Sequence, residues 1–175
     1  MNAPSGNGLP ISEAQFFRIH RFFCREAALL SEGDYRQWFE LCEPSIHYRV
    51  MPPVFGEPGR TSTLGYGRDY FNEDWHALKI RVEQLTTPNF TIAENPKSVV
   101  RYLVTNIDGV VTDDGFEVTS NVLVYRIRAT EPVPSMVTAA RRDQLVDGEA
   151  GITLKRRVAQ LDQVSLQQPN FSIFI

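Results

Sequence analysis

The chain has 175 residues, 42% of them hydrophobic and 22% charged, which is the size and composition of one ordinary globular domain. Its formal net charge is −3, so binding to nucleic acid would require a strongly segregated basic face. No apolar run approaches the roughly 20 residues that span a bilayer, and we expect neither nucleic acid nor a membrane as a partner.

The ends and the cysteines suggest where the protein works. The first ten residues, MNAPSGNGLP, have neither a basic segment nor an apolar core and do not resemble a signal peptide. We predict a flexible lead-in over residues 1–10 and a single domain over residues 11–175. Cys24 and Cys42 are too few for a disulfide framework, so a cytoplasmic location is expected.

Helix signals dominate the first half of the chain. Ser12 with Gln15 forms a capping-box pattern, and Gly33 is the residue type that commonly ends a helix. Between them apolar residues recur at helical spacing. These residues are Phe16, Ile19, Phe23, Ala27 and Leu30. Asp34 starts a short second helix, and Asn72 is the expected N-cap of a third, which carries NEDWHALKIRVEQL.

Strand signals dominate the second half. SIHYRVM, residues 45–51, already alternates like a strand, and a long loop is expected over residues 54–70. After Pro96 come four β-rich runs separated by turn sequences: SVVRYLVTNIDGVV, FEVTSNVLVYRIRA, MVTAARRDQLV and ITLKRRVAQLD. Helices first and antiparallel strands afterwards form the α+β pattern, with helices packed on one face of a sheet.

The predicted strands are apolar on both faces. In NVLVYRI, two valines, Val122 and Val124, point to one face, and the opposite face carries Leu123, Tyr125 and Ile127. Three helices cover only one face, so the second face should line a pocket or meet another subunit. The terminal PNFSIFI is too apolar for solvent and should dock on its own domain or on a partner.

Motifs for metal, phosphate or nucleophilic chemistry are weak. His20, His47 and His76 have no metal-ligand spacing relative to one another or to the cysteines. The sequence Gly65–Gly67 lacks the rest of a phosphate-binding loop. No histidine is placed by motif to activate Cys42, which is better interpreted as a buried thiol.

An acid–base pocket is the strongest enzymatic alternative. A histidine and a carboxylate at hydrogen-bond distance are sufficient for general acid–base catalysis. The residues that could line such a pocket are His47, Tyr48, Asp69, Tyr70 and His76. Aromatic residues at such places are more often part of a core, and the spacing does not choose between the two interpretations.

The 18 basic residues include only three lysines. Folding the chain about DGEAG would bring Arg141–Arg142 opposite Lys155–Arg156–Arg157, and like charges directly opposite each other are destabilising. Asp143 is the only acid among them, so the cluster needs anions from elsewhere. A solvated charged face and a protein interface both account for it, whereas a nucleic-acid surface lacks stacking aromatic residues.

The chain resembles the β (small) subunits of bacterial aromatic-ring-hydroxylating dioxygenases, the Rieske non-haem iron oxygenases. The resemblance runs from about Phe17 to the C-terminus. It is carried in order by EAALLSEGDYRQWFEL, IHYRVMPPV, FNEDWHALKIRVEQL, AENPKSVVRYLVTN, VTSNVLVYRIR, ARRDQL and PNFSIFI. It implies a cystatin-like (NTF2-like) cone, in which a long N-terminal helix and short helices pack on a strongly curved, mixed but mainly antiparallel sheet.

The resemblance also implies a non-catalytic role. The family's cytoplasmic hexamers contain three α and three β subunits. The α subunits carry the Rieske [2Fe–2S] cluster, the mononuclear Fe(II) and the substrate pocket, and a reductase and a ferredoxin deliver electrons from NAD(P)H. A Rieske centre needs C-x-H and C-x-x-H pairs, which are missing from this sequence. We therefore expect no cofactor, metal or catalytic residue in this chain.

The predicted special residues are structural. We expect a subunit interface or structural ion pairs at Arg141, Arg142, Asp143, Arg157 and Phe174. The second hypothesis is a stand-alone NTF2-like isomerase or dehydratase that uses His47 or His76 with a carboxylate. A third is a ligand-binding domain of the same fold. The sequence does not record which aromatic compound would be the substrate.

Overall fold

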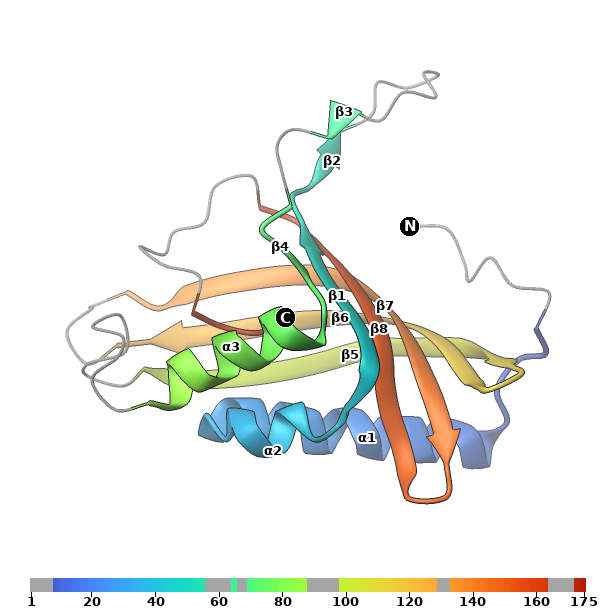
Figure 1. Cartoon of the computed structure of the whole chain (residues 1–175). Coiled ribbons are helices and arrows are strands. Elements are labelled where there is room, and N and C mark those ends of the chain that lie inside the picture. Colours follow the sequence, from blue (N-terminus) through green and yellow to red (C-terminus); the bar gives the residue numbers. More distant parts are fainter. Residues whose placement is uncertain (1–7, 56–63, 66–68, 88–97, 129–132, 164–171) are drawn as a thin grey trace.

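The computed structural model describes residues 8–55, 64–65, 69–87, 98–128, 133–163 and 172–175. Its three helices are α1 (Glu13–Glu32), α2 (Tyr35–Phe39) and α3 (Trp75–Thr86). Its strands are β1 (Cys42–Met51), β2 (Val54–Phe55), β3 (Leu64–Gly65), β4 (Phe71–Glu73), β5 (Val99–Thr112), β6 (Gly115–Ile127), β7 (Ser135–Gly148) and β8 (Gly151–Leu161). The predicted α+β class is confirmed (Figure 1).

The helix ends follow the local sequence, with one exception. The capping box of α1 is complete, because Ser12 and Gln15 bond each other's backbone N–H groups, and Gly33 closes the helix at a left-handed φ of 75°. The prediction that Asn72 caps α3 is wrong. Asp74 is the cap and accepts a bond from the Ala77 N–H at 2.9 Å, because Asn72 belongs to β4 instead.

Six strands form one mixed sheet in the order β4-β1-β8-β7-β6-β5. The β1–β8 pair is parallel and the other pairs are antiparallel. This agrees with the expected mixed, mainly antiparallel sheet. The expectation of a loop over residues 54–70 is corrected in part, because β2 and β3 pair with each other as a small separate ladder.

The register of the β7–β8 hairpin differs from the expected one. The two basic clusters are not opposite each other: Asp143 pairs with Arg157, while Arg142 pairs with Val158 and Arg141 with Ala159. Because successive side chains point to opposite faces of a strand, the hairpin places Arg141 and Arg157 inside the domain and Arg142 outside it.

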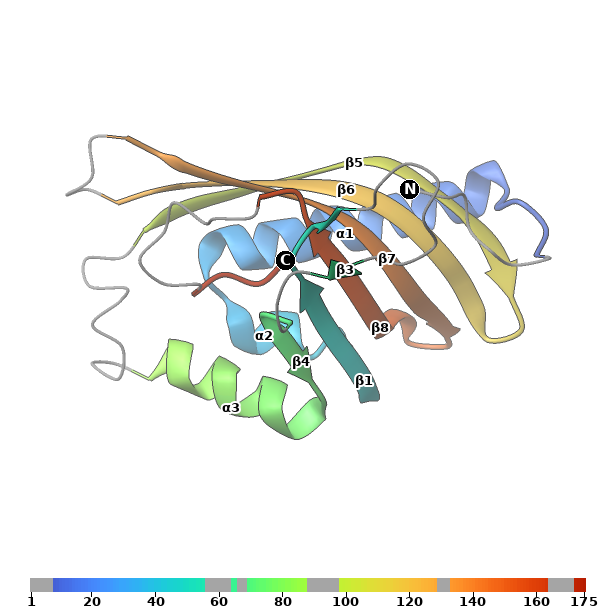
Figure 2. The ribbon, with the colours of Figure 1, turned by 90° about the horizontal axis from the view of Figure 1, so that it is seen from above.

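The sheet is strongly curved and the helices pack against it (Figure 2). Helix α1 packs along β5, and α3 packs against β1 and β4. Register shifts in the β5–β6 and β7–β8 ladders mark bulges, which bend and twist strands. At Gly115 a Cβ would lie 2.0 Å from the carbonyl oxygen of Leu145, so β6 and β7 approach too closely for any other residue.

The other side of the sheet carries apolar, partly exposed side chains over β5, β6 and β7. Cross-strand partners place six apolar or aromatic side chains together on it, a surface that we call the outer sheet face. These residues are Val99, Leu103, Leu123, Tyr125, Ile127 and Met136. Leu103 is 52% exposed and Met136 is 57% exposed. Contiguous apolar surface of this kind marks an interaction site.

The last residues of the sequence return to the interior. In the segment Ser172–Ile175, called the tail below, Ile173, Phe174 and Ile175 are all buried. The prediction that this segment docks is confirmed, and it docks on its own domain. The part of PNFSIFI before Ser172 lies outside the described residues.

Candidate functional site

Four ionisable side chains are buried together in the cone. They come from α1 (Glu26), β7 (Arg141 and Asp143) and β8 (Arg157), and none is more than 1% exposed. We call them the buried-charge cluster. Two positive and two negative side chains make its formal charge zero, which is the condition under which buried charges are tolerated.

Arg157 is the centre of this cluster. Its guanidinium donates to both carboxylate oxygens of Asp143 at 2.8 Å and to the two oxygens of Glu26 at 2.7 and 3.1 Å. The planar fork of arginine is suited to such bidentate pairing, which a lysine could not reproduce. The two carboxylates raise the pKa of Arg157 against the effect of its burial.

Glu26 is held ionised by its neighbours. Burial by itself would raise the pKa of this carboxyl group, but the charges of Arg157 and Arg141 outweigh it and lower the pKa to about 2. Trp38 adds a hydrogen bond from its indole N–H at 3.2 Å. A carboxylate with so low a pKa and so many donors is a poor proton acceptor at neutral pH.

Arg141 completes the cluster. It donates to Glu26 at 3.2 Å and to the hydroxyl of Ser120 at 3.1 Å, and its guanidinium lies 5.0 Å from the ring centre of Phe23. Its Nη2 has no hydrogen-bond partner among the described residues. Burial and the nearby charge of Arg157 lower its pKa.

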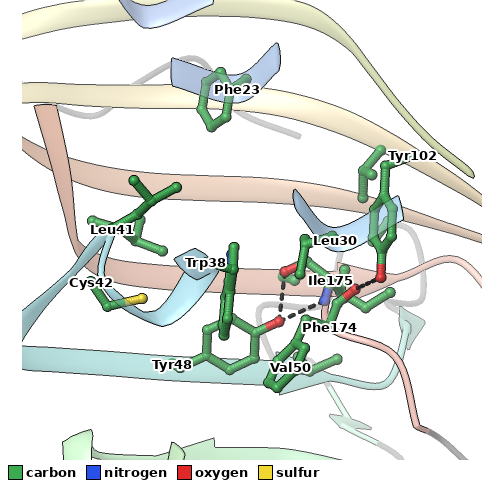
Figure 3. Close-up of a cluster of buried hydrophobic side chains, with 14 of the residues drawn as sticks. Phe23, Leu30, Trp38, Leu41, Cys42, Tyr48, Val50, Tyr102, Phe174 and Ile175 are labelled. Atoms are coloured by element: carbon green, nitrogen blue, oxygen red, sulfur yellow. Dashed lines mark hydrogen bonds between the residues drawn. The ribbon is translucent and has the colours of Figure 1, made fainter. Parts of the chain in front are cut away.

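The tail contacts this cluster through Arg157, and Figure 3 shows its hydrogen bonds with two buried tyrosines. The hydroxyl of Tyr48 donates to the backbone oxygen of Ile175 at 2.7 Å and accepts from its N–H at 2.6 Å. The hydroxyl of Tyr102 donates to the carbonyl oxygen of Phe174 at 2.8 Å. Arg157 reaches the same Ile175 oxygen at 3.3 Å. Strands β1, β5 and β8 thus each supply a side chain that binds the backbone of the tail.

A third arginine covers the tail from α3. The guanidinium carbon of Arg81 lies 4.1 Å from the ring centre of Phe174 and 3.9 Å from that of Phe71. Its Nη2 lies 2.7 Å from the carboxylate of Glu73, whose pKa is raised by partial burial against the effect of Arg81. Cation–π contacts of this kind are stronger where water is excluded.

The acid–base pocket considered as the enzymatic alternative is not formed. His47 and His76 are both exposed, and His47 lies 2.7 Å from Asn72. Asp69 pairs with Arg49 at 2.7 Å, and Tyr70 is exposed. The interpretation of these residues as one pocket is therefore wrong. Tyr48 alone points into the cone, because in β1 it follows the outward-pointing His47.

The remaining predicted residues are in different places. Phe174 is fully buried in its own chain, and Cys42 is buried as expected, with its pKa raised to about 12 by burial and the nearby Glu26. Arg142 is half exposed, 3.9 Å from Glu117.

The sequence patterns did not single out Glu26, although it lies one turn after the buried Phe22 and Phe23 and four residues before Leu30. A carboxylate on the apolar side of a helix is a signal of a buried partner.

An open groove of about 330 Å³ lies between α1 and the turn that joins β7 and β8. We call it the basic groove, and it is lined by Arg18, Arg21, Phe22, Arg25, Gly151 and Ile152. Arg18 pairs with Asp147. Within the described ranges, Arg21 and Arg25 form no ion pair, so the groove presents uncompensated positive charge beside an apolar floor.

Comparison with known proteins decides the family. Residues 25–168 match the family described as the ring hydroxylating β subunit. This chain belongs to that family. The β subunit of benzene 1,2-dioxygenase from Pseudomonas putida is 34% identical over 164 residues, which cover 89% of this chain and 86% of the relative. The small oxygenase component of a naphthalene 1,2-dioxygenase system from a Ralstonia species is 31% identical over 158 residues, covering 86% and 80% of the two chains.

Solved structures agree with membership of this β-subunit family. A chain of naphthalene 1,2-dioxygenase superposes with a TM-score of 0.83 at 25% identity, covering 94% of this chain and 88% of that one. A candidate scytalone dehydratase from Novosphingobium aromaticivorans has a TM-score of 0.61 at 15% identity, covering 92% of this chain and 91% of that one, and shows a shared fold. The predicted family and NTF2-like fold are both confirmed, and the isomerase or dehydratase hypothesis is not supported.

Two properties of the described residues bear on cofactors and membranes. No group of three or more histidine, cysteine or acidic side chains among them is arranged to hold a metal ion. The donors that a Rieske centre or a mononuclear iron requires therefore do not meet in the described ranges. None of the described helices combines the length and apolarity needed to cross a membrane.

Proposed function

We propose that this chain is the non-catalytic β subunit of a cytoplasmic α3β3 ring-hydroxylating dioxygenase, in which it scaffolds the catalytic α subunits. The α partner would carry the Rieske [2Fe–2S] cluster and the mononuclear Fe(II), with electrons from NAD(P)H passing through a reductase and a ferredoxin. The complex would add both atoms of O₂ to an aromatic hydrocarbon or aromatic acid and give a cis-dihydrodiol.

The observation that carries the non-catalytic role is the state of the cone interior. In a stand-alone enzyme of this fold, the interior would need an accessible acid or base. Here both interior carboxylates are held by Arg157, and Phe174 and Ile175 fill the neighbouring space. Charges that are already paired and hydrogen-bonded stabilise a structure and are not available to a substrate.

Two surfaces support a scaffold role on the outside. The outer sheet face presents contiguous apolar side chains, which are the usual centre of a stable interface. The basic groove presents Arg21 and Arg25 without an acidic partner in the described ranges, which suits an acidic segment of another subunit. We assign the outer sheet face and the basic groove as the contact surfaces.

The experiment is co-expression with an α subunit and measurement of mass and iron content. The intact chain should elute as a red-brown hexamer in gel filtration. The variant Leu103→Asp, which places a charge in the outer sheet face, should reduce hexamer recovery at least 10-fold. Ile80→Asp is the matched control, because Ile80 is 55% exposed on α3, away from both surfaces.

Two results would contradict the proposal. One is a colourless chain that remains monomeric with an α subunit present. The other is equal hexamer recovery from the Leu103→Asp and Ile80→Asp variants, which would exclude the outer sheet face as the contact surface.

The substrate class is inferred from the names of the relatives alone. Curated relatives are named for the dioxygenation of benzene, chlorobenzene and biphenyl. We propose an aromatic compound of this range as the substrate of the complex, and the choice among them belongs to the α subunit.

A further inference from the structure

The basic groove is held in shape by contacts within and between its two walls. Helix α1 forms one wall and is capped at each end, and the turn between β7 and β8 forms the other with Gly151 and Ile152. Arg18 joins the two walls, because its Nη1 donates to the carboxylate of Asp147 at 2.7 Å. The N–H of Asp147 donates in turn to the backbone oxygen of Asp114 at 3.0 Å. A partner would meet a groove that is already formed, and less ordering on binding favours affinity.

Two cations of the groove have no counter-ion in the part of the chain that the structure describes. Arg21 and Arg25 are exposed, and neither forms an ion pair or a hydrogen bond with a described side chain. They are four residues apart in α1, which places them about 6 Å apart along the helix axis. Like charges at this spacing destabilise a helix. The chain by itself therefore carries an unfavourable pair of charges that a bound anion would relieve.

The groove also has an apolar floor. Phe22 is 6% exposed, and Ile152 is partly buried against the hydrophobic core. An inorganic anion would gain nothing from such a floor, because a charge next to apolar surface loses hydration. The occupant that satisfies the whole groove carries carboxylates beside an apolar side chain, as an amphipathic peptide segment does.

We propose that the basic groove binds an acidic, amphipathic helix of the catalytic α subunit. This helix would present two carboxylates one turn apart to Arg21 and Arg25, because residues i and i+4 of a helix have the same spacing as the two arginines. An apolar side chain beside the carboxylates would cover Phe22 and Ile152. The α subunit enters from the proposed function, on which this assignment rests.

A second copy of this chain does not supply such a helix. The acidic residues of α1 are Glu13, Glu26 and Glu32, and no two of them are four positions apart. Helix α2 has no acidic residue, and α3 has Glu83 alone, 3.9 Å from Lys79. Within the described residues the groove therefore has no complementary helix on its own kind of chain, and a different chain is the better partner.

The test is the salt dependence of the purified complex. The hexamer of the intact chain with the α subunit should dissociate more readily as NaCl rises from about 0.1 M to about 1 M, because the screening length falls from about 10 Å to about 3 Å. The double variant Arg21→Glu with Arg25→Glu should raise the dissociation constant at the lower salt concentration at least 10-fold and flatten its salt dependence. Analytical ultracentrifugation measures both quantities.

Two matched double variants separate the position of the charges from the net charge. Arg21→Lys with Arg25→Lys keeps both cations and should keep both assembly and its salt dependence. Arg36→Glu with Lys79→Glu changes the net charge as much as the groove reversal does, at exposed positions of α2 and α3. It should leave the dissociation constant within about 2-fold of that of the intact chain. Equal weakening by the two reversals would mean that net charge alone matters and would overturn the proposal.

A peptide arm tests the groove even when no complex forms. The probe is an alanine-rich helical peptide of about 16 residues, with two glutamates four positions apart and a phenylalanine directly before the second. It should bind the isolated full chain in fluorescence anisotropy, and its counterpart with two glutamines should bind at least 10-fold more weakly. The groove reversal should remove this preference.

The two arms distinguish the groove from the scaffold role. Charge-dependent binding of the peptide without any hexamer would contradict the scaffold role and support the chemistry of the groove. A normal hexamer that is insensitive to the groove reversal, or equal binding of the two peptides, would overturn the assignment of the groove and leave the scaffold role intact.

Discussion

Asp143 and Arg157 lie directly opposite each other in the β7–β8 ladder, and their side chains share two hydrogen bonds of 2.8 Å inside the cone. This pairing compensates one of the two arginines, Arg141 and Arg157, that the hairpin directs into the domain. Glu26, from a helix more than a hundred residues earlier in the chain, supplies the second carboxylate. The inward-facing charges of the hairpin are thus compensated within one chain.

Arg157 and Arg142 should differ strongly in their effect on stability. Arg157→Met leaves Glu26 and Asp143 buried with Arg141 as the one remaining cation of the cluster, and breaking a buried pair in this way costs about 3–5 kcal/mol. Arg142→Met should change the free energy of unfolding by less than about 1 kcal/mol, since its side chain is half exposed and 3.9 Å from Glu117. Urea unfolding of the two variants measures the difference, and equal losses would contradict it.

Stability should fall at acidic pH because of Glu26. The pKa of this group in the folded chain is about 2, below its ordinary value of 4.5. Its ionised form is therefore favoured by folding, and the resulting contribution, about 3 kcal/mol, is present above pH 4.5 and lost as the pH falls towards 2. Urea midpoints between pH 2 and 6 should show this slope. Glu26→Gln should flatten it and lower stability at pH 7, whereas Glu83→Gln, at an exposed position of α3, should change neither.

The Tyr48 hydroxyl should contribute through the tail. Tyr48→Phe keeps the ring but leaves the N–H of Ile175 without its partner, at a cost of about 1–3 kcal/mol. Tyr125→Phe removes a hydroxyl from the half-buried outer sheet face and should cost less than about 0.5 kcal/mol. Thermal unfolding compares the two variants. A loss of the same size in both would mean that the tail bond contributes no more than an ordinary surface hydroxyl.

The two thiols should react at very different rates. Cys24 is exposed on α1 with its Sγ 3.6 Å from Nδ1 of His20, whereas Cys42 is buried and its pKa is raised to about 12. Because the thiolate is the reactive form, Ellman's reagent should label one thiol per native chain and two per unfolded chain. Cys24→Ser should abolish the native reaction. Rapid labelling of the native Cys24→Ser chain would show that Cys42 is accessible.

Local signals predicted the local structure well and the long-range contacts poorly. The capping box at Ser12 and the end of α1 at Gly33 form as expected, because both depend on residues only a few positions apart. The local sequence predicts the N-cap of α3 at Asn72, whereas the cap is Asp74. The pairing of β4 with β1 decides where that helix starts. The alternative pocket of His47, Tyr48, Asp69, Tyr70 and His76 is not formed for a similar reason, since the pleat of β1 directs His47 outwards.

By itself the sequence determined the class of the fold and the docking of the apolar tail. Its resemblance to known β subunits also indicated the family. Composition and short-range periodicity depend on few residues, so they can be read directly. Only the tertiary structure decided which carboxylates neutralise the hairpin arginines and where the tail binds. Glu26 and Arg157 are 131 residues apart, and a contact at that separation depends on the register and curvature of the whole sheet, which no local pattern records.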